Sequence, residues 1–127
     1  MVALDAATGD VVWTQATGAL TYSTPAIAGD RIFVGGFDGS LHAYRAETGE
    51  LLWERYVGGR ILAPALVVGD LAFFSTLETE TYAARVSDGK VVWHLGLGKY
   101  SPGIATDRRY YFSLNGLLMA FEGSRSP

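Results

Sequence analysis

Few residues in this sequence have the types and spacings that catalysis or metal binding requires. The two histidines, His42 and His94, lie too far apart to form a His-x-x-x-His metal motif, and we interpret both as residues of strand surfaces. Glu78 and Glu80 could place two carboxylates on one side of a hairpin, a spacing that a calcium site can use, although a solvated turn is the favoured interpretation. We therefore assign no catalytic, cofactor-binding or metal-ligating residue from the sequence.

The composition excludes several classes of function. The chain has no cysteine, which rules out disulfides, thiolate metal sites and a cysteine nucleophile, and no serine lies in a Gly-x-Ser-x-Gly elbow. Its ten basic residues are scattered and outnumbered by thirteen acids, for a net charge of −3, so we expect no nucleic-acid surface. The sequence has no run of 18 apolar residues, so no membrane span is predicted. The N-terminus shows no secretion-signal pattern.

The elements that must position these residues are organised by one motif that occurs three times. It has the pattern Gly-x-x-x-Trp, and consecutive tryptophans are 40 residues apart. A period of about 40 residues is typical of a β-propeller blade or of a helical solenoid repeat. The segments between the tryptophans are short, rich in Val, Ile, Leu, Phe and Tyr, and bounded by turn residues. This pattern predicts strands and sets the helical solenoid aside.

Each repeat is predicted to form four antiparallel strands, which is the number in a propeller blade. The first strand begins near a proline, as at 24–27, and the second follows a Gly-Asp turn, as at 31–35. The third follows a hairpin with Asp38-Gly39 or Asn115-Gly116, pairs suited to a two-residue type I′ turn, and the fourth carries the tryptophan. The next repeat has Glu78-Thr79 where a glycine is expected, which predicts a wider or strained turn.

The predicted fold class is therefore all-β: propeller blades of four antiparallel strands, about three blades, in a partial ring. We expect the third and fourth strands of a first blade in residues 1–17, blades in 18–57 and 58–97, and a last blade without its outer strand in 98–123. In a ring, the N-terminal strand usually completes the last blade. The C-terminus is accordingly expected to be natural and the N-terminus to be cut.

The motif residues have a structural interpretation as docking residues between blades. The glycines supply left-handed turn residues, and the aspartate and threonines can hydrogen-bond to the backbone and hold that turn. The tryptophans are expected to pack between adjacent blades, each burying about 150–250 Å². The predicted structural docking residues are Asp5, Thr8, Gly9, Trp13, Thr48, Gly49, Trp53, Gly89 and Trp93.

The stretch from Ala3 to Trp13 resembles the tryptophan-docking motif of the pyrroloquinoline-quinone-like (PQQ-like) propeller repeat family, Ala-x-Asp-x-x-Thr-Gly-x-x-x-Trp. Later copies depart from it: the aspartate position holds Arg45 and Arg85, and a threonine position holds Asp88. The family includes quinoprotein alcohol dehydrogenases, a periplasmic propeller lipoprotein of outer-membrane assembly, and sensor domains of bacterial kinases. The resemblance implies a propeller fold and a periplasmic or extracytoplasmic location.

The resemblance also frames the hypotheses about function. Quinoprotein enzymes of the family hold their cofactor with calcium-binding acids, a stacking tryptophan and, in many, a disulfide; none of that set can be placed here, so we expect no PQQ in this chain. The favoured hypothesis is a non-enzymatic protein-interaction or scaffold module, made of the C-terminal blades of a propeller. Its partner would be another protein or the rest of the same propeller. The alternatives are a C-terminal fragment of a PQQ-dependent dehydrogenase and a self-assembling half-propeller that forms a homodimer.

Overall fold

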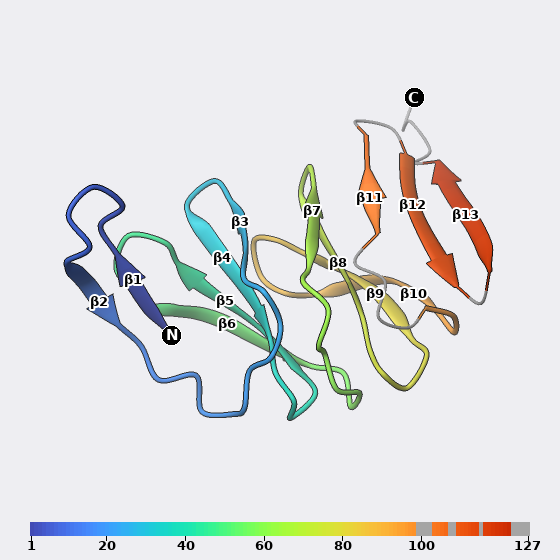
Figure 1. The fold of residues 1–127 in the computed structure, drawn as a ribbon. Helices are drawn as coiled ribbons and strands as arrows, with labels where there is room; N and C mark the ends of the chain where they lie inside the picture. The colour runs from blue at the N-terminus through green and yellow to red at the C-terminus, as the bar shows by residue number, and fades with distance from the viewer. Residues whose placement is uncertain (99–102, 107–108, 115, 123–127) are drawn as a thin grey trace.

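The computed structural model describes residues 1–98, 103–106, 109–114 and 116–122, and it consists of strands and their connections (Figure 1). Within these residues no helix is long and apolar enough to cross a membrane. The strands are β1 (Val2–Leu4), β2 (Val11–Thr14), β3 (Ala26–Ala28), β4 (Arg31–Gly35), β5 (Ser40–Arg45), β6 (Leu51–Tyr56), β7 (Leu66–Val68), β8 (Leu71–Ser75), β9 (Thr81–Arg85), β10 (Val91–Leu95), β11 (Ile104–Ala105), β12 (Arg109–Leu114) and β13 (Leu117–Glu122).

These strands form four antiparallel sheets that follow one another along the chain. The first sheet contains β1 and β2, the second has the order β3-β4-β5-β6, the third β7-β8-β9-β10, and the fourth β11-β12-β13. Figure 1 shows the sheets side by side, fanned like propeller blades and not closed into a ring. The predicted all-β, partial propeller is confirmed.

Two local predictions differ from the structure. The strand expected at 24–27 begins only at Ala26, because Pro25 has no N–H to donate to a strand ladder. The connection between β4 and β5 spans 36–39, and Gly39 has a φ of 92° whereas Asp38 has no positive φ. A type I′ turn needs a positive φ at both central residues, so the two-residue turn predicted at Asp38-Gly39 is wrong. Asn115, in the other predicted hairpin, lies outside the described residues.

The connection between β8 and β9 has the strain that its lack of glycine predicts. Thr79 has a φ of 69°, and among the described residues it is the one non-glycine residue with a positive φ. It occupies the position that Gly39 has in the second sheet, 40 residues earlier. A β-branched residue in this conformation costs on the order of 1–3 kcal/mol.

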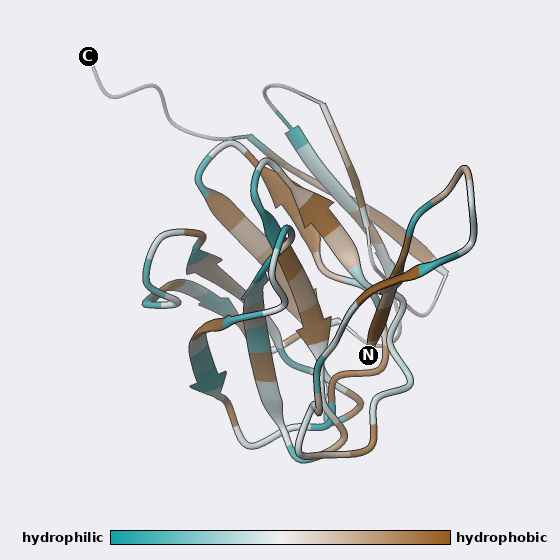
Figure 2. Cartoon of the chain, turned by 90° about the vertical axis from the view of Figure 1, so that its left-hand side faces the viewer, coloured by the Kyte–Doolittle hydropathy of each residue, from teal (hydrophilic) through white to brown (hydrophobic). Residues whose placement is uncertain are grey.

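The main core lies between the second and third sheets. Phe33 and Leu41 face it from the second sheet and Phe74 from the third, while Ile61 fills it from the connection between the sheets. All four are 0–1% exposed. Figure 2 shows hydrophobic residues along the strands and hydrophilic residues in many of the turns. The core therefore lies between neighbouring sheets and holds them together.

A smaller core between the third and fourth sheets contains Tyr110 of β12. Its ring stacks on Phe73, with the ring centroids 4.5 Å apart. Among the described residues its hydroxyl has no hydrogen-bond partner, and burial raises the pKa of Tyr110 to about 12. The folded chain thus keeps this proton at pH values where the unfolded chain has lost it.

We predict that the protein loses stability between pH 10 and 12. The pKa of Tyr110 rises from 10.0 in the unfolded chain to about 12 in the folded chain. Its contribution to the free energy of unfolding is therefore complete below pH 10 and is lost as the pH rises to about 12. The loss in the free energy of unfolding is about 3 kcal/mol. Tyr110→Phe should remove this part of the loss and leave the part that Tyr44 and Tyr82 contribute, since burial raises the pKa of both, and it should not lower stability at neutral pH. Urea unfolding across this pH range measures the effect, with Tyr22→Phe, at an exposed tyrosine, as the control. An equal alkaline loss in wild type and Tyr110→Phe would contradict the prediction.

Candidate functional site

Each tryptophan of the repeat is positioned by a β-bulge. In β2, β6 and β10 the register with the preceding strand shifts immediately before the tryptophan. In β6, Leu51 pairs with Tyr44 and Trp53 pairs with Ala43, which leaves Leu52 as the extra residue. A bulge bends its strand and re-aims the side chain that follows. The two apolar residues before each tryptophan therefore form the bulge that sets the direction of the indole.

The first two tryptophans reach across to the following sheet. Trp13 Nε1 donates a hydrogen bond to the carbonyl oxygen of Ala46 at 3.0 Å, and Trp53 Nε1 donates to that of Val86 at 2.9 Å. Both acceptors lie in the turn between the last two strands of the following sheet. The same contact is thus made twice, one repeat apart.

A glycine makes room for each of these indoles. A Cβ atom built on Gly49 would lie 2.6 Å from the Trp13 ring, and one on Gly89 would lie 2.6 Å from the Trp53 ring. Their φ angles of 74° and 69° also favour glycine. The sequence predicted the turn requirement, but the close approach of the neighbouring indole is a second requirement that only the structure reveals.

The outermost copies of the motif have different surroundings. Gly9 has a φ of 79°, but nothing lies within 4 Å of a Cβ built on it. Trp93 packs edge-on against Phe73 and Phe121, with ring centroids 6.2 and 5.5 Å apart. The indole-to-glycine contact is therefore seen between the first and second sheets and between the second and third.

Asp5 and the threonines hydrogen-bond to the backbone of these turns. Asp5 Oδ1 accepts from the backbone N–H groups of Thr8 and Ala7 at 2.9 and 2.8 Å, and these bonds lower the pKa of the Asp5 carboxyl. Thr8 Oγ1 accepts from the backbone N–H of Asp10 at 3.2 Å, and Thr48 makes the equivalent bond at 3.3 Å. A negative charge on Asp5 strengthens its bonds to the turn.

The later copies keep this turn with different side chains. Arg45, at the aspartate position, forms an ion pair with Glu50 at 3.3 Å, and Arg85 forms one with Asp88 at 2.8 Å. Asp88 also replaces a threonine hydroxyl, because its Oδ1 accepts from the backbone N–H of Lys90 at 2.9 Å. The departures from the motif therefore preserve its geometry.

The opposite end of the sheets is formed by four connections, 15–25, 36–39, 57–65 and 76–80, which we name the loop face (bottom of Figure 1). Backbone hydrogen bonds join these connections in pairs. Phe37 N–H donates to the carbonyl oxygen of Leu20, and Leu77 N–H donates to that of Arg60, both at 2.9 Å. The loops of neighbouring sheets are thereby tied into one surface.

Four side chains form a continuous row across the loop face, which we name the aromatic row: Tyr22, Phe37, Arg60 and Glu78. Tyr22 packs edge-on against Phe37 at 6.1 Å, and the Arg60 guanidinium lies over the Phe37 ring, 5.4 Å from its centroid. Arg60 Nε also donates to Glu78 Oε1 at 2.7 Å. Tyr22 is 68% exposed and Phe37 39% exposed. No local sequence pattern marks this row, because its members come from four separate loops.

The residues that the sequence offered for chemistry are separated in the structure. Glu78 binds Arg60, whereas Glu80 pairs with His94 of β10, so the two carboxylates do not converge as a calcium site requires. His42 of β5 is buried and lies opposite Glu54 of β6. Neither histidine lies in the aromatic row.

Comparisons with known proteins identify the type of repeat. A family model described as outer membrane protein assembly factor BamB matches residues 1–124. The crystal structure of BamB from Moraxella catarrhalis superposes with a TM-score of 0.80 at 23% identity over 90% of this chain. A europium-containing methanol dehydrogenase superposes with a TM-score of 0.60 at 26% identity over 73% of it. The chain spans 37% and 20%, respectively, of the lengths of these two proteins. No curated protein sequence matches it.

We predict that Gly89→Ala destabilises the protein more than Gly69→Ala. Both positions have a positive φ, 69° and 59°, so both variants strain the backbone. Nothing lies within 4 Å of a Cβ on Gly69, whereas a Cβ on Gly89 collides with Trp53. We expect a loss of about 1–2 kcal/mol for Gly69→Ala and about 1–3 kcal/mol more for Gly89→Ala. Urea unfolding of both variants measures the difference. Equal losses would show that the indole contact contributes nothing beyond the turn.

Proposed function

Because the chain belongs to the family described as outer membrane protein assembly factor BamB, whose members are PQQ-like propeller repeats, we propose that it is a non-enzymatic protein-interaction or scaffold module. The chain is similar in fold to BamB, and the description of the family calls BamB an outer membrane protein assembly factor. The proposal places the interaction on the loop face, at the end of the sheets away from the tryptophan contacts.

The observation that carries this proposal is the aromatic row. Tyrosine and arginine are enriched among the residues that dominate protein–protein binding, and aromatic side chains bring a large contact area. Phe37 lies at the centre of the row, with Tyr22 on one side and Arg60 on the other. Because Glu78 holds the Arg60 guanidinium, the row is ordered before a partner binds, which reduces the entropy lost on binding.

The same proposal gives the predicted docking residues a supporting role. The contacts of Trp13 and Trp53 with the following turns would hold the sheets at fixed angles, and thus keep the loops in register. In this interpretation the blades correspond to 1–17, 18–57, 58–97 and 98–123, as the repeat predicts. The motif residues are then structural and form no ligand platform.

The proposal predicts that an unfolded outer membrane protein binds the chain through the aromatic row. The probe is a fluorescently labelled outer membrane protein diluted from urea, and its anisotropy reports binding. The double variant Phe37→Ala and Arg60→Ala should weaken binding at least about tenfold, or 1.4 kcal/mol. Leu51→Ala is the matched control, because Leu51 is 45% exposed and lies at the opposite end of β6. The proposal fails if wild type does not bind, or if the control weakens binding as much as the double variant.

A second candidate is a fragment of a quinoprotein dehydrogenase, which the similarity to methanol dehydrogenase favours. This candidate predicts that PQQ and calcium together bind the chain. Calorimetric titration should then give a dissociation constant below about 10 μM, or a binding free energy of about −7 kcal/mol. Our proposal expects no binding at this concentration, and a saturable heat signal would reverse the ranking of the two functions.

A further inference from the structure

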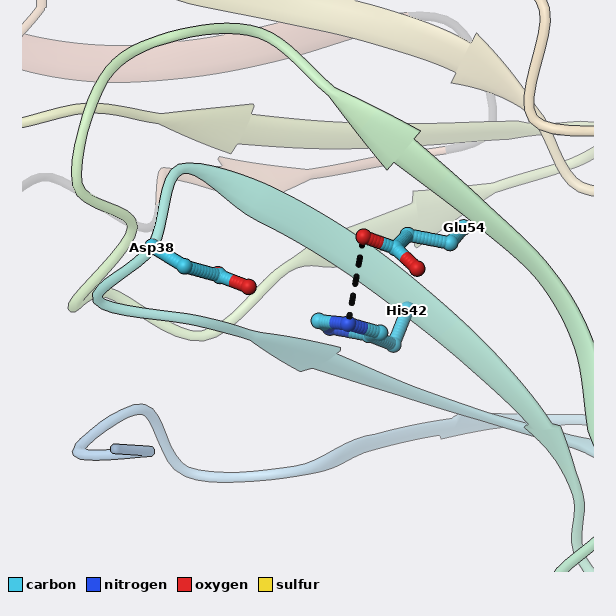
Figure 3. Close-up of side chains that lie close together, drawn as sticks. All are labelled: Asp38, His42 and Glu54. Carbon is cyan, nitrogen blue, oxygen red and sulfur yellow. Dashed lines mark ion pairs between the residues drawn. The ribbon is translucent and has the colours of Figure 1, made fainter. Parts of the chain in front are cut away.

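Three side chains near the loop face converge on one point of the second sheet. Asp38 lies in the connection between β4 and β5, His42 on β5 and Glu54 on β6. Their ligand atoms, one from each side chain, all lie within 4.8 Å of one another. Figure 3 shows the Asp38 and Glu54 carboxylates directed toward the imidazole of His42. The cluster therefore combines one imidazole nitrogen with two carboxylates.

The imidazole of His42 is largely buried and faces the Glu54 carboxylate at a distance longer than a hydrogen bond. The residue is 6% exposed, and the contact of its ring nitrogens that the structure describes is an ion pair with Glu54. Its Nε2 lies 3.8 Å from Glu54 Oε1, which is too long for a hydrogen bond. Buried polar side chains are nearly always hydrogen-bonded, to the protein or to ordered water, so this face of the imidazole is open to a water molecule or an ion beside the two carboxylates.

The surroundings hold the cluster in place and make it negative. Glu54 Oε1 accepts a hydrogen bond from Ser40 Oγ at 2.8 Å, and Asp38 Oδ1 accepts one from Ser40 N–H at 3.1 Å. The ring of Tyr44 stacks on His42 with centroids 6.0 Å apart. Burial, and then the charges of Glu54 and Asp38, raise the pKa of Tyr44. A cation at this point would relieve the repulsion between the two carboxylates.

We propose that Asp38, His42 and Glu54 bind a divalent first-row transition metal ion, with Zn²⁺ as the expected occupant. A donor set of one imidazole and two carboxylates suits Zn²⁺ better than calcium or magnesium, which prefer oxygen ligands alone. Around Zn²⁺ the ligand atoms lie about 3.3 Å apart, so the exposed carboxylates must move inward while the buried imidazole stays fixed. Three protein ligands leave the fourth tetrahedral position for water.

The third sheet shows that this cluster is not required by the fold. The positions 40 residues later hold Glu78, Tyr82 and His94. There Glu78 binds Arg60, and His94 binds Glu80, so each charged side chain already has a partner within the chain. The second sheet is different, because its histidine is buried and its ion pair with Glu54, at 3.8 Å, is too long for a hydrogen bond.

The test is a calorimetric titration of the whole 127-residue chain with Zn²⁺, with the visible absorption of bound Co²⁺ as a second readout. We expect one ion per chain. His42→Gln should weaken binding at least about 100-fold, and Glu54→Gln and Asp38→Asn at least about tenfold each. The two carboxylate variants keep an oxygen that can accept the Ser40 hydrogen bonds, so they remove ligand charge with little effect on the fold.

His94→Gln is the matched control, because it removes the other histidine of the chain and leaves the proposed site intact. It should bind Zn²⁺ as wild type does and give the same Co²⁺ spectrum. The proposal is overturned if the dissociation constant of wild type for Zn²⁺ is about 1 mM or weaker. It is also overturned if Glu54→Gln and Asp38→Asn bind as tightly as wild type, or if His94→Gln alone abolishes binding.

Discussion

The arrangement of the first three sheets depends on one repeated contact, in which the indole of a tryptophan lies against the glycine of the following repeat. This contact requires a ring that reaches out of its own sheet and a neighbour without a side chain. Trp13 with Gly49 and Trp53 with Gly89 meet both conditions, and in each pair the indole N–H also finds a backbone carbonyl. The hydrogen bond fixes the direction of the ring, while the ring itself covers apolar surface.

The two ends of each sheet consequently serve different purposes. At the turn that receives the indole, substitutions are compensated: the Arg45 and Arg85 ion pairs stand where the first copy has Asp5. In the loop face and in the strands next to it, equivalent positions have diverged, since Gly39 corresponds to Thr79 and His42 to Tyr82. The same turn geometry is thus kept at one end of the sheets, while the side chains vary at the other.

The repeat and its strands could be predicted because they follow from local rules. The 40-residue spacing of the tryptophans, together with short apolar segments, is sufficient to predict four-stranded blades. The prediction of a two-residue turn at Asp38-Gly39 was wrong, because a glycine in a left-handed conformation also suits a longer connection. The contact of Phe37 with Arg60 and the approach of His42 to Glu54 join residues far apart in sequence, and only strand register and sheet packing bring them together.

The indole contact runs in one direction along the chain, from Trp13 and from Trp53 to the turn of the sheet that follows. The surface that provides the indole and the surface that receives it are therefore different, which makes both of these junctions heterologous. A junction of this kind cannot relate two copies by a self-complementary two-fold interface. Any assembly built through it must close into a cycle or extend as a filament, and the angle between successive sheets decides which of the two forms.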